Sequence, residues 1–265
     1  MLEFKLSSNY GSITHFFHFM YGVFFPLILN HLETNEKDYV LYGSIAPMNA
    51  IFELPFVITI IPNKYKPQNI KTLQPLDNIK TEFNNHFFTY NIFKKIRKFI
   101  KHNVPKYLKE IDYKKIILIE RKTDERYKNV YYGNSEYKDV LKTSGDERRK
   151  IGNHNELVKR LKKEFKKDFK NVSLENTSIY YQYLLFHKAN VIIANHGASL
   201  SNICFMKKNS NVIEIISNNK LNVEKEDEFK LIANSCKVNH QYIELENDFS
   251  NIDIDNMIEK IKQVY

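Results

Sequence analysis

The chain has 265 residues, 43% of them hydrophobic, and a formal charge of +9 from 40 Lys and Arg against 31 Asp and Glu. These values exclude a disordered or fibrous chain, and the length fits one large domain or two compact ones. The two cysteines, Cys204 and Cys236, exclude a disulfide scaffold and lack the spacing of a zinc cluster. The surplus of positive charge favours nucleic acid, anionic lipid and phosphorylated substrates alike, so it does not choose among them.

The first hundred residues predict helices mixed with short strands. Apolar positions at helical spacing indicate helices, and short β-branched runs indicate strands, one of them stopped by Pro62. The expected helices are 13–32, 46–53 and 83–101, and the expected strands are 38–43 and 56–61. We therefore expect an N-terminal α/β domain over residues 1–104.

Further along, strands and helices alternate more regularly. The expected strands are 115–119, 171–174, 190–194 and 211–216, and the expected helices are 153–165, 177–187 and 199–206. This alternation predicts a parallel sheet with right-handed connections, in a second α/β domain over residues 105–250. Apolar positions in the last residues, 251–265, form one stripe, so the chain should end in an amphipathic helix.

No part of the sequence predicts export or membrane insertion. The N-terminus lacks the basic and apolar regions of a signal peptide. The most apolar stretch, 16–29, is shorter than the about 20 residues that a membrane span needs. We expect a cytoplasmic or otherwise soluble protein with no signal peptide, no transmembrane segment and no stable membrane insertion.

The most informative stretch is the turn His196-Gly197-Ala198, which follows a buried strand and leads into a helix. Ligands of parallel sheets bind at the carboxyl ends of the strands. Gly197 permits close approach of the backbone to a ligand, and the N–H groups that open a helix attract phosphate. His196 and Ser199 can donate further hydrogen bonds, and Asn202 lies over the same helix face. The alternative is an ordinary turn in which Gly197 serves geometry and His196 is a packed polar residue.

The same residues weakly resemble the nucleophile elbow of a hydrolase, G-x-S-x-G. Ser201 stands where the last glycine belongs, and His196 precedes Ser199 instead of following it far downstream. A serine hydrolase is therefore disfavoured.

Residues 191–215, VIIANHGASLSNICFMKKNSNVIEI, resemble the signature of glycosyltransferase family 61. The typical form is a hydrophobic strand, H-G-A-G-L-T-N, and a second strand that ends in Ile-Glu. Ser199 replaces the second glycine of the motif, and Ser201 replaces its threonine. Upstream motifs occur in the family's order. Arg121 stands where the family has the arginine of I-S-R, and Arg149 to Glu156 resemble R-R-x-x-N-E-x-E-L, with His154 in place of the first Glu. Glu175, Gln182 and Ala189 then resemble the family's E…Q…A-D. The resemblance covers residues 115–216.

This resemblance implies a GT-B-like fold, in which two Rossmann-like domains face a cleft and the C-terminal amphipathic helix crosses back to pack on the N-terminal domain. It implies an inverting glycosyltransferase that moves a sugar from a nucleotide sugar, UDP-linked, to a hydroxyl of a glycan or glycoprotein acceptor. Glu214 would accept hydrogen bonds from the ribose hydroxyls. The implied donor-binding residues are His196, Gly197, Ala198, Ser199, Asn202, Glu214, Arg121, Arg149, Glu175 and Gln182.

Inversion by a single in-line displacement requires a base for the acceptor hydroxyl and positive groups for the departing diphosphate. The N-terminal half offers His18 as the base, with His15 and Glu53 as alternatives. A histidine on an apolar helix can also be a core or capping residue. Arg121 and Arg149 are the expected positive groups, together with His196.

We expect no catalytic metal and no cofactor other than the donor. Asp253-Ile-Asp255 has the D-x-D form of a metal site, but acidic residues that open a helix also favour its dipole. The alternative function is a non-catalytic nucleotide or nucleic-acid binding module with a basic surface. Because the sequence has no recognisable RNA- or DNA-binding motif, nucleic acid is not an expected partner.

Overall fold

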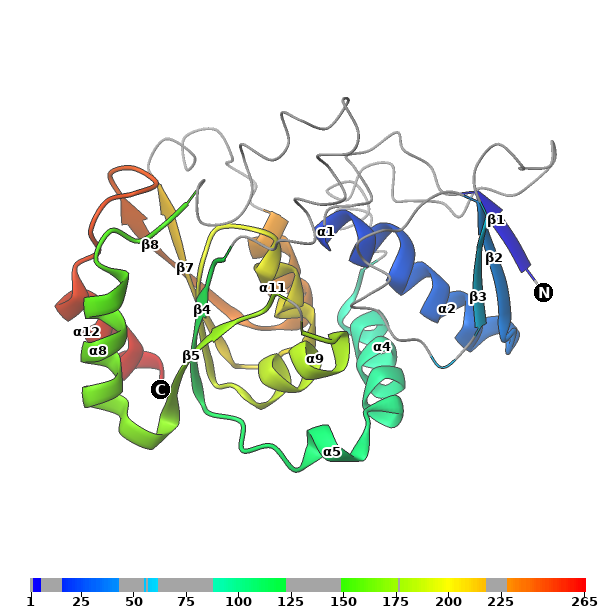
Figure 1. The fold of residues 1–265 in the computed structure, drawn as a ribbon, viewed down its shortest axis with the longest axis horizontal. Helices are drawn as coiled ribbons and strands as arrows, with labels where there is room; N and C mark the ends of the chain where they lie inside the picture. Colours follow the sequence, from blue (N-terminus) through cyan, green and yellow to red (C-terminus); the bar gives the residue numbers. More distant parts are fainter. Residues whose placement is uncertain are drawn as a thin grey trace. The chain divides into compact units, whose positions relative to one another are not determined.

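The computed structural model describes residues 2–5, 16–42, 55, 57–61, 88–122, 149–175, 177–217 and 228–265. The chain forms two compact units, Met1–Val104 and Pro105–Tyr265. Each unit contains a parallel sheet accompanied by helices (Figure 1). The mixed α/β class expected from the sequence is therefore confirmed.

The N-terminal unit has a three-stranded parallel sheet in the order β1-β2-β3. Its strands are β1 (Leu2–Lys5), β2 (Asp38–Tyr42) and β3 (Val57–Ile61), and the helical stretch before β2 comprises α1 (Phe16–Phe19), the π-helical η1 (Met20–Phe24) and α2 (Phe25–Thr34). Pro26 lies in the first turn of α2, where its missing N–H is tolerated. Asn35, in the left-handed conformation at φ 60°, ends the helix.

Aromatic side chains form much of the core of this unit. The rings of Phe88 and Phe93 stack with centroids 5.5 Å apart, and Tyr21 meets Phe88 edge-on at 5.2 Å. Phe93 belongs to α4 (Tyr90–Asn103), whose first turn is capped by Thr89. The expected helix over 46–53 lies outside the described residues. Among the helices that the structure describes, none is both long and apolar enough to cross a membrane.

The C-terminal unit has a five-stranded sheet in which all strands are parallel, in the order β5-β4-β6-β7-β8. The strands are β4 (Ile116–Glu120), β5 (Phe169–Ser173), β6 (Val191–Asn195), β7 (Asn211–Ser217) and β8 (Asn239–Leu245). The order reverses between β4 and β6, because the chain first adds β5 on one side of β4 and then β6 on the other. Ligands of open α/β sheets bind at such a switch point, at the carboxyl ends of the strands.

Helices cover both faces of this sheet (Figure 1). On one face are α8 (His154–Phe165) and α12 (Ile254–Val264); on the other are α9 (Ile179–Lys188), the 3-10 helix η7 (Ala198–Phe205) and α11 (Glu228–Cys236). The short helices α5 (Lys106–Lys109) and η6 (Lys166–Asp168) precede β4 and β5. Alternate strand residues face opposite helices, as the period of two requires.

The C-terminal helix packs within its own unit. Its buried side chains Ile254, Met257, Ile258 and Ile261 join one core with α8 and the strands. Ion pairs link α12 to α8, between Asp255 and Arg160 and between Lys262 and Glu164. Its apolar stripe thus helps to form the core of the C-terminal unit, and the expectation that this helix also packs on the N-terminal domain stays a prediction.

Candidate functional site

The turn after β6 is held by backbone hydrogen bonds. The His196 N–H donates to the Ile215 carbonyl of β7 at 2.8 Å, and the Leu200 N–H donates to the Gly197 carbonyl at 2.9 Å. Gly197 has φ 154° and ψ −178°, a conformation essentially restricted to glycine. The helix expected over 199–206 is present as the 3-10 helix η7. Within it, the Asn202 amide donates to the Ser199 carbonyl, a local side-chain bond that competes with regular α-helical pairing.

Two guanidinium groups converge on this turn. Nη1 of Arg149 donates to the carbonyl oxygen of His196 at 2.5 Å, and Nη1 of Arg121 donates to the same oxygen at 3.2 Å. Arg121 directly follows β4, so both arginines lie at the switch point of the sheet. A Cβ atom on Gly197 would lie 2.5 Å from Nη1 of Arg121 and 3.7 Å from Nη1 of Arg149. The structure thus brings Arg121, Arg149 and Gly197, which we expected to bind the donor, together at His196.

Arg149 is the first residue of a segment, 149–153, that is hydrogen-bonded to residues 248–252, just before α12. The Lys150 N–H donates to the Asp248 carbonyl, and the Gly152 N–H donates to the Ser250 carbonyl, each at 3.0 Å. The Asn153 side chain then bonds the backbone of Ile252 in both directions: its amide donates to the carbonyl and its oxygen accepts from the N–H, each at 2.9 Å.

Gly152 allows this close pairing, because a Cβ there would lie 2.7 Å from the carbonyl oxygen of Phe249. A distant part of the chain thus holds Arg149 in place, which the sequence reasoning did not foresee.

The side chain of Glu214 on β7 is fully buried between two histidines. Nδ1 of His196 lies 2.5 Å from one carboxylate oxygen, and Nε2 of His240 on β8 lies 2.8 Å from the other. Burial raises the pKa of the Glu214 carboxyl, but the hydrogen bonds from His196 and His240 outweigh burial and lower that pKa to about 2. The carboxylate is therefore ionised and accepts from both rings.

We expected Glu214 to accept hydrogen bonds from ribose hydroxyls. The structure places its carboxylate out of reach of solvent, with each oxygen already accepting from a histidine. Its direct effect is on His196: the bond to Nδ1 fixes the orientation of the imidazole ring. Phe229 of α11 packs edge-on against the His196 ring, with centroids 5.2 Å apart.

Asn202 and Gln182 are brought together, but in the interior. The Asn202 amide donates to the Gln182 oxygen at 2.9 Å, and the Gln182 amide donates to the Thr177 carbonyl at 3.2 Å. Both side chains are buried. We expected both to bind the donor. In the structure their hydrogen bond joins η7 to α9, so it holds in place the helix that follows the turn.

The remaining expected donor-binding residues lie at the same edge of the sheet. Glu175, just after β5, accepts from the Lys122 N–H at 3.1 Å and from the Ser173 hydroxyl, so it anchors the chain directly after Arg121. Ala198 is exposed and Ser199 is half-buried in the first turn of η7. The first N–H groups of a helix have no partner within the helix, and an anion can accept from such groups.

The residues expected to act as the base belong to the N-terminal unit. His18 lies in α1, is half-buried, and meets Phe17 edge-on with ring centroids 5.5 Å apart. His15 and Glu53 lie outside the described residues.

The D-x-D sequence has a structural role at α12. The Asp253 side chain caps the helix by accepting from the Asn256 N–H at 3.0 Å, and Asp255 pairs with Arg160. In the described part of the chain, no group of three or more His, Cys, Asp or Glu side chains is arranged to hold a metal ion.

The profile of the family Glycosyltransferase 61 matches residues 16–213, well over half of the chain. The chain belongs to glycosyltransferase family 61. The resemblance seen in the HGASLSN motif is confirmed, and the protein is a glycosyltransferase. Enzymes of this kind in general use a nucleotide-sugar donor and a glycan acceptor. No curated protein matched the chain.

The part of this glycosyltransferase that matches the family, residues 16–213, contains the turn at Gly197 together with Arg121 and Arg149. It ends one residue before Glu214. Glu214, Phe229 and His240 therefore lie beyond it. The sequence reasoning missed Phe229 and His240. The amphipathic pattern over 228–236 could have found Phe229, because it predicts one more helix, whereas polar residues obscure the strand that carries His240.

Proposed function

We propose that this glycosyltransferase binds a UDP-sugar at the turn after β6 and transfers the sugar, with inversion, to a hydroxyl of a glycan or glycoprotein. The observation that carries this proposal is the convergence of Arg121 and Arg149 on the His196 carbonyl at the switch point of the sheet. Two guanidinium groups beside a glycine turn provide positive charge where a diphosphate can approach the backbone closely.

In an in-line displacement, negative charge develops on the departing diphosphate. Arg121 and Arg149 would stabilise that charge electrostatically, with the His196 ring beside them at the turn. Because the arginines supply this charge themselves, we propose that transfer requires no metal ion. The family match favours this transferase over the alternative of a non-catalytic nucleotide or nucleic-acid binding module.

The acceptor hydroxyl needs a base, for which we propose His18, with His15 and Glu53 as alternatives. We also propose the GT-B arrangement, in which the N-terminal unit would bring this base to the donor. A variant of the true base should lose kcat while its UDP affinity stays unchanged. Single substitutions His18→Ala, His15→Ala and Glu53→Gln, compared for kcat and for UDP affinity, identify which one it is.

The proposal is tested by thermal unfolding with UDP, GDP and CMP, each in EDTA and in Mn²⁺. Saturation at about 100 times Kd stabilises the folded state by about 2.7 kcal/mol, which raises the Tm by several degrees. We expect a UDP-selective rise that persists in EDTA. It should be lost in Arg149→Ala and retained in Arg160→Ala, a control whose side chain pairs with Asp255 of α12. A rise that requires Mn²⁺ would overturn metal independence, and no rise with any nucleotide would overturn the site.

A further inference from the structure

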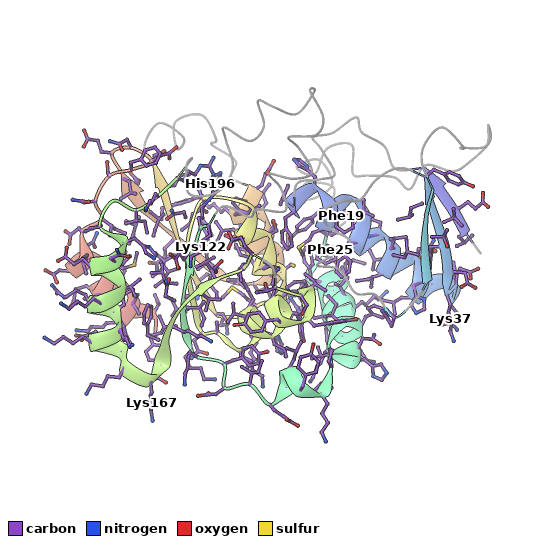
Figure 2. The ribbon with its side chains drawn as sticks, viewed as in Figure 1. Phe19, Phe25, Lys37, Lys122, Lys167 and His196 are labelled. Carbon is purple, nitrogen blue, oxygen red and sulfur yellow. The ribbon has the colours of Figure 1, made fainter. Side chains whose placement is uncertain are left out.

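Lysines gather at the edge of the C-terminal sheet opposite the turn. Because all five strands are parallel, the loops that lead into them lie at one edge, and every one of these loops carries lysine. The lysines are Lys114 and Lys115 before β4, Lys166, Lys167 and Lys170 around the start of β5, Lys188 before β6, Lys207 and Lys208 before β7, and Lys237 before β8. We call these nine residues the basic edge. Figure 2 shows Lys167 and His196 at opposite ends of this sheet.

Backbone hydrogen bonds join these loops into one continuous surface. Each loop bonds to the next at 2.8–3.0 Å, through Lys115 to Asp168, Asn190 to Lys115, Asn211 to Asn190, and Asn209 to Lys237. The pKa of Lys207 is lowered by burial and by the charges of Lys115 and Lys188, which shows that ammonium groups from three loops act on one another.

Few carboxylates offset this charge. The acidic side chains of the same loops are Glu110, Asp112 and Asp168, of which Asp112 pairs with Lys114. The opposite edge mixes charges instead: Glu120, Glu175, Glu246 and Asp248 accompany Arg121, Arg149, Lys122 and Lys150. Much of the unit's positive surplus is thus concentrated at the basic edge.

Exposed apolar side chains flank the basic edge. Tyr107 of α5 is 66% exposed and Ile111 is 37% exposed, and the Tyr113 hydroxyl donates to the Leu108 carbonyl, which holds α5 against the loop before β4. Tyr265 is 47% exposed at the end of α12, where the Asn211 amide donates to the Val264 carbonyl. Tyrosines beside lysines are typical of surfaces that meet the headgroup region of a membrane.

We propose that the basic edge docks the enzyme on an anionic lipid surface, with the lysine ammonium groups on lipid phosphates and Tyr107 and Ile111 at the headgroup boundary. Lysines spread over five loops form a broad face that matches a charged plane. Single-stranded nucleic acid prefers a groove with stacked aromatic rings, which makes it the less suitable partner. This inference does not depend on the donor chemistry, because it uses the opposite edge of the sheet.

The test measures binding of the full chain to phosphatidylcholine vesicles with and without 30% phosphatidylglycerol. We expect binding only to the anionic vesicles, and a steep decrease with salt. Each lysine near such a surface contributes about fivefold to partitioning, the equivalent of about 1 kcal/mol. The triple variant Lys167→Gln, Lys188→Gln, Lys208→Gln should therefore bind about 100-fold more weakly.

A matched control removes the same charge elsewhere on the unit, through Lys150→Gln, Lys159→Gln and Lys230→Gln, and should retain most of the binding. Equal losses in both triple variants would overturn the proposal, as would absence of vesicle binding or displacement of the enzyme from vesicles by single-stranded RNA at equal charge. UDP-dependent thermal shifts, measured on the same variants, report on the donor site separately.

Discussion

The imidazole of His196 lies 2.5 Å from the carboxylate of Glu214, a residue on the neighbouring strand whose side chain is wholly buried. This contact joins the turn after β6 to β7, and through Glu214 it reaches His240 on β8. Three adjacent strands therefore determine how one ring at the candidate donor site is oriented.

The substitution Glu214→Gln tests this orientation. A glutamine offers one acceptor oxygen where two rings donate, so one histidine loses its partner. We expect the free energy of unfolding to fall by about 2–3 kcal/mol and UDP affinity to fall about tenfold. Urea unfolding and UDP titration measure the two effects. Glu244→Gln, on the exposed face of β8, should change neither. Unchanged UDP affinity in Glu214→Gln would mean that His196 needs no support from Glu214.

The free energy of unfolding at acidic pH should depend on the ionisation of Glu214. Its folded pKa of about 2 lies below the ordinary 4.5, so between these values the unfolded chain binds more protons than the folded one. The contribution to stability is complete above pH 4.5 and is lost as pH falls towards 2, by roughly 3 kcal/mol in all. Unfolding by urea from pH 6 to pH 2 should show the gap between wild type and Glu214→Gln closing over this window. If the difference in the free energy of unfolding between wild type and Glu214→Gln stays constant down to pH 2, the lowered pKa of Glu214 is contradicted.

Gly197→Ala should damage the site more than the fold. The new Cβ would lie 2.5 Å from Nη1 of Arg121, at the end of a flexible side chain that can move away. The backbone conformation remains strained for alanine, at a cost of about 1–3 kcal/mol. We expect a folded protein with a lowered Tm and UDP affinity reduced at least tenfold. Gly152→Ala, whose Cβ would meet backbone atoms instead, serves as the comparison and should lower the Tm further while reducing UDP affinity less.

Asn153→Ala should weaken the donor site from a distance. The substitution removes both hydrogen bonds to Ile252 and loosens the segment that carries Arg149. We expect the free energy of unfolding to fall by about 1–3 kcal/mol. We expect UDP affinity to fall several-fold. Asn171→Ala, which removes a side-chain bond to Glu120 from β5, is the matched control. Equal effects of the two variants on UDP affinity would remove the special role of Asn153.

Local patterns predicted much of the C-terminal unit. The apolar runs at 115–119, 190–194 and 211–216 correspond to β4, β6 and β7 within a residue or two, because a buried parallel strand needs little beyond its own composition. The glycine turn followed from the same reasoning. For β8, polar residues such as Asn239 and Gln241 on a half-buried edge strand obscure the alternation.

Contacts between distant residues were harder to predict. Nothing near Glu214 in the sequence distinguishes a strand-end carboxylate that meets a ribose from one that is enclosed by His196 and His240. The interior positions of Asn202 and Gln182 likewise depend on how η7 packs against α9. A sequence motif identifies which residues gather at a site, whereas burial decides which of them can touch a ligand.

The pairing of residues 149–153 with 248–252 also has a consequence for biosynthesis. These segments are about a hundred residues apart in the sequence, and the hydrogen bonds between them hold Arg149 in place. During synthesis, β4, β6 and the glycine turn leave the ribosome well before residues 248–252. Such long-range closure is slow to form. The emerging polypeptide can therefore build most of its sheet without a competent site for the donor, which residues 248–252 then complete.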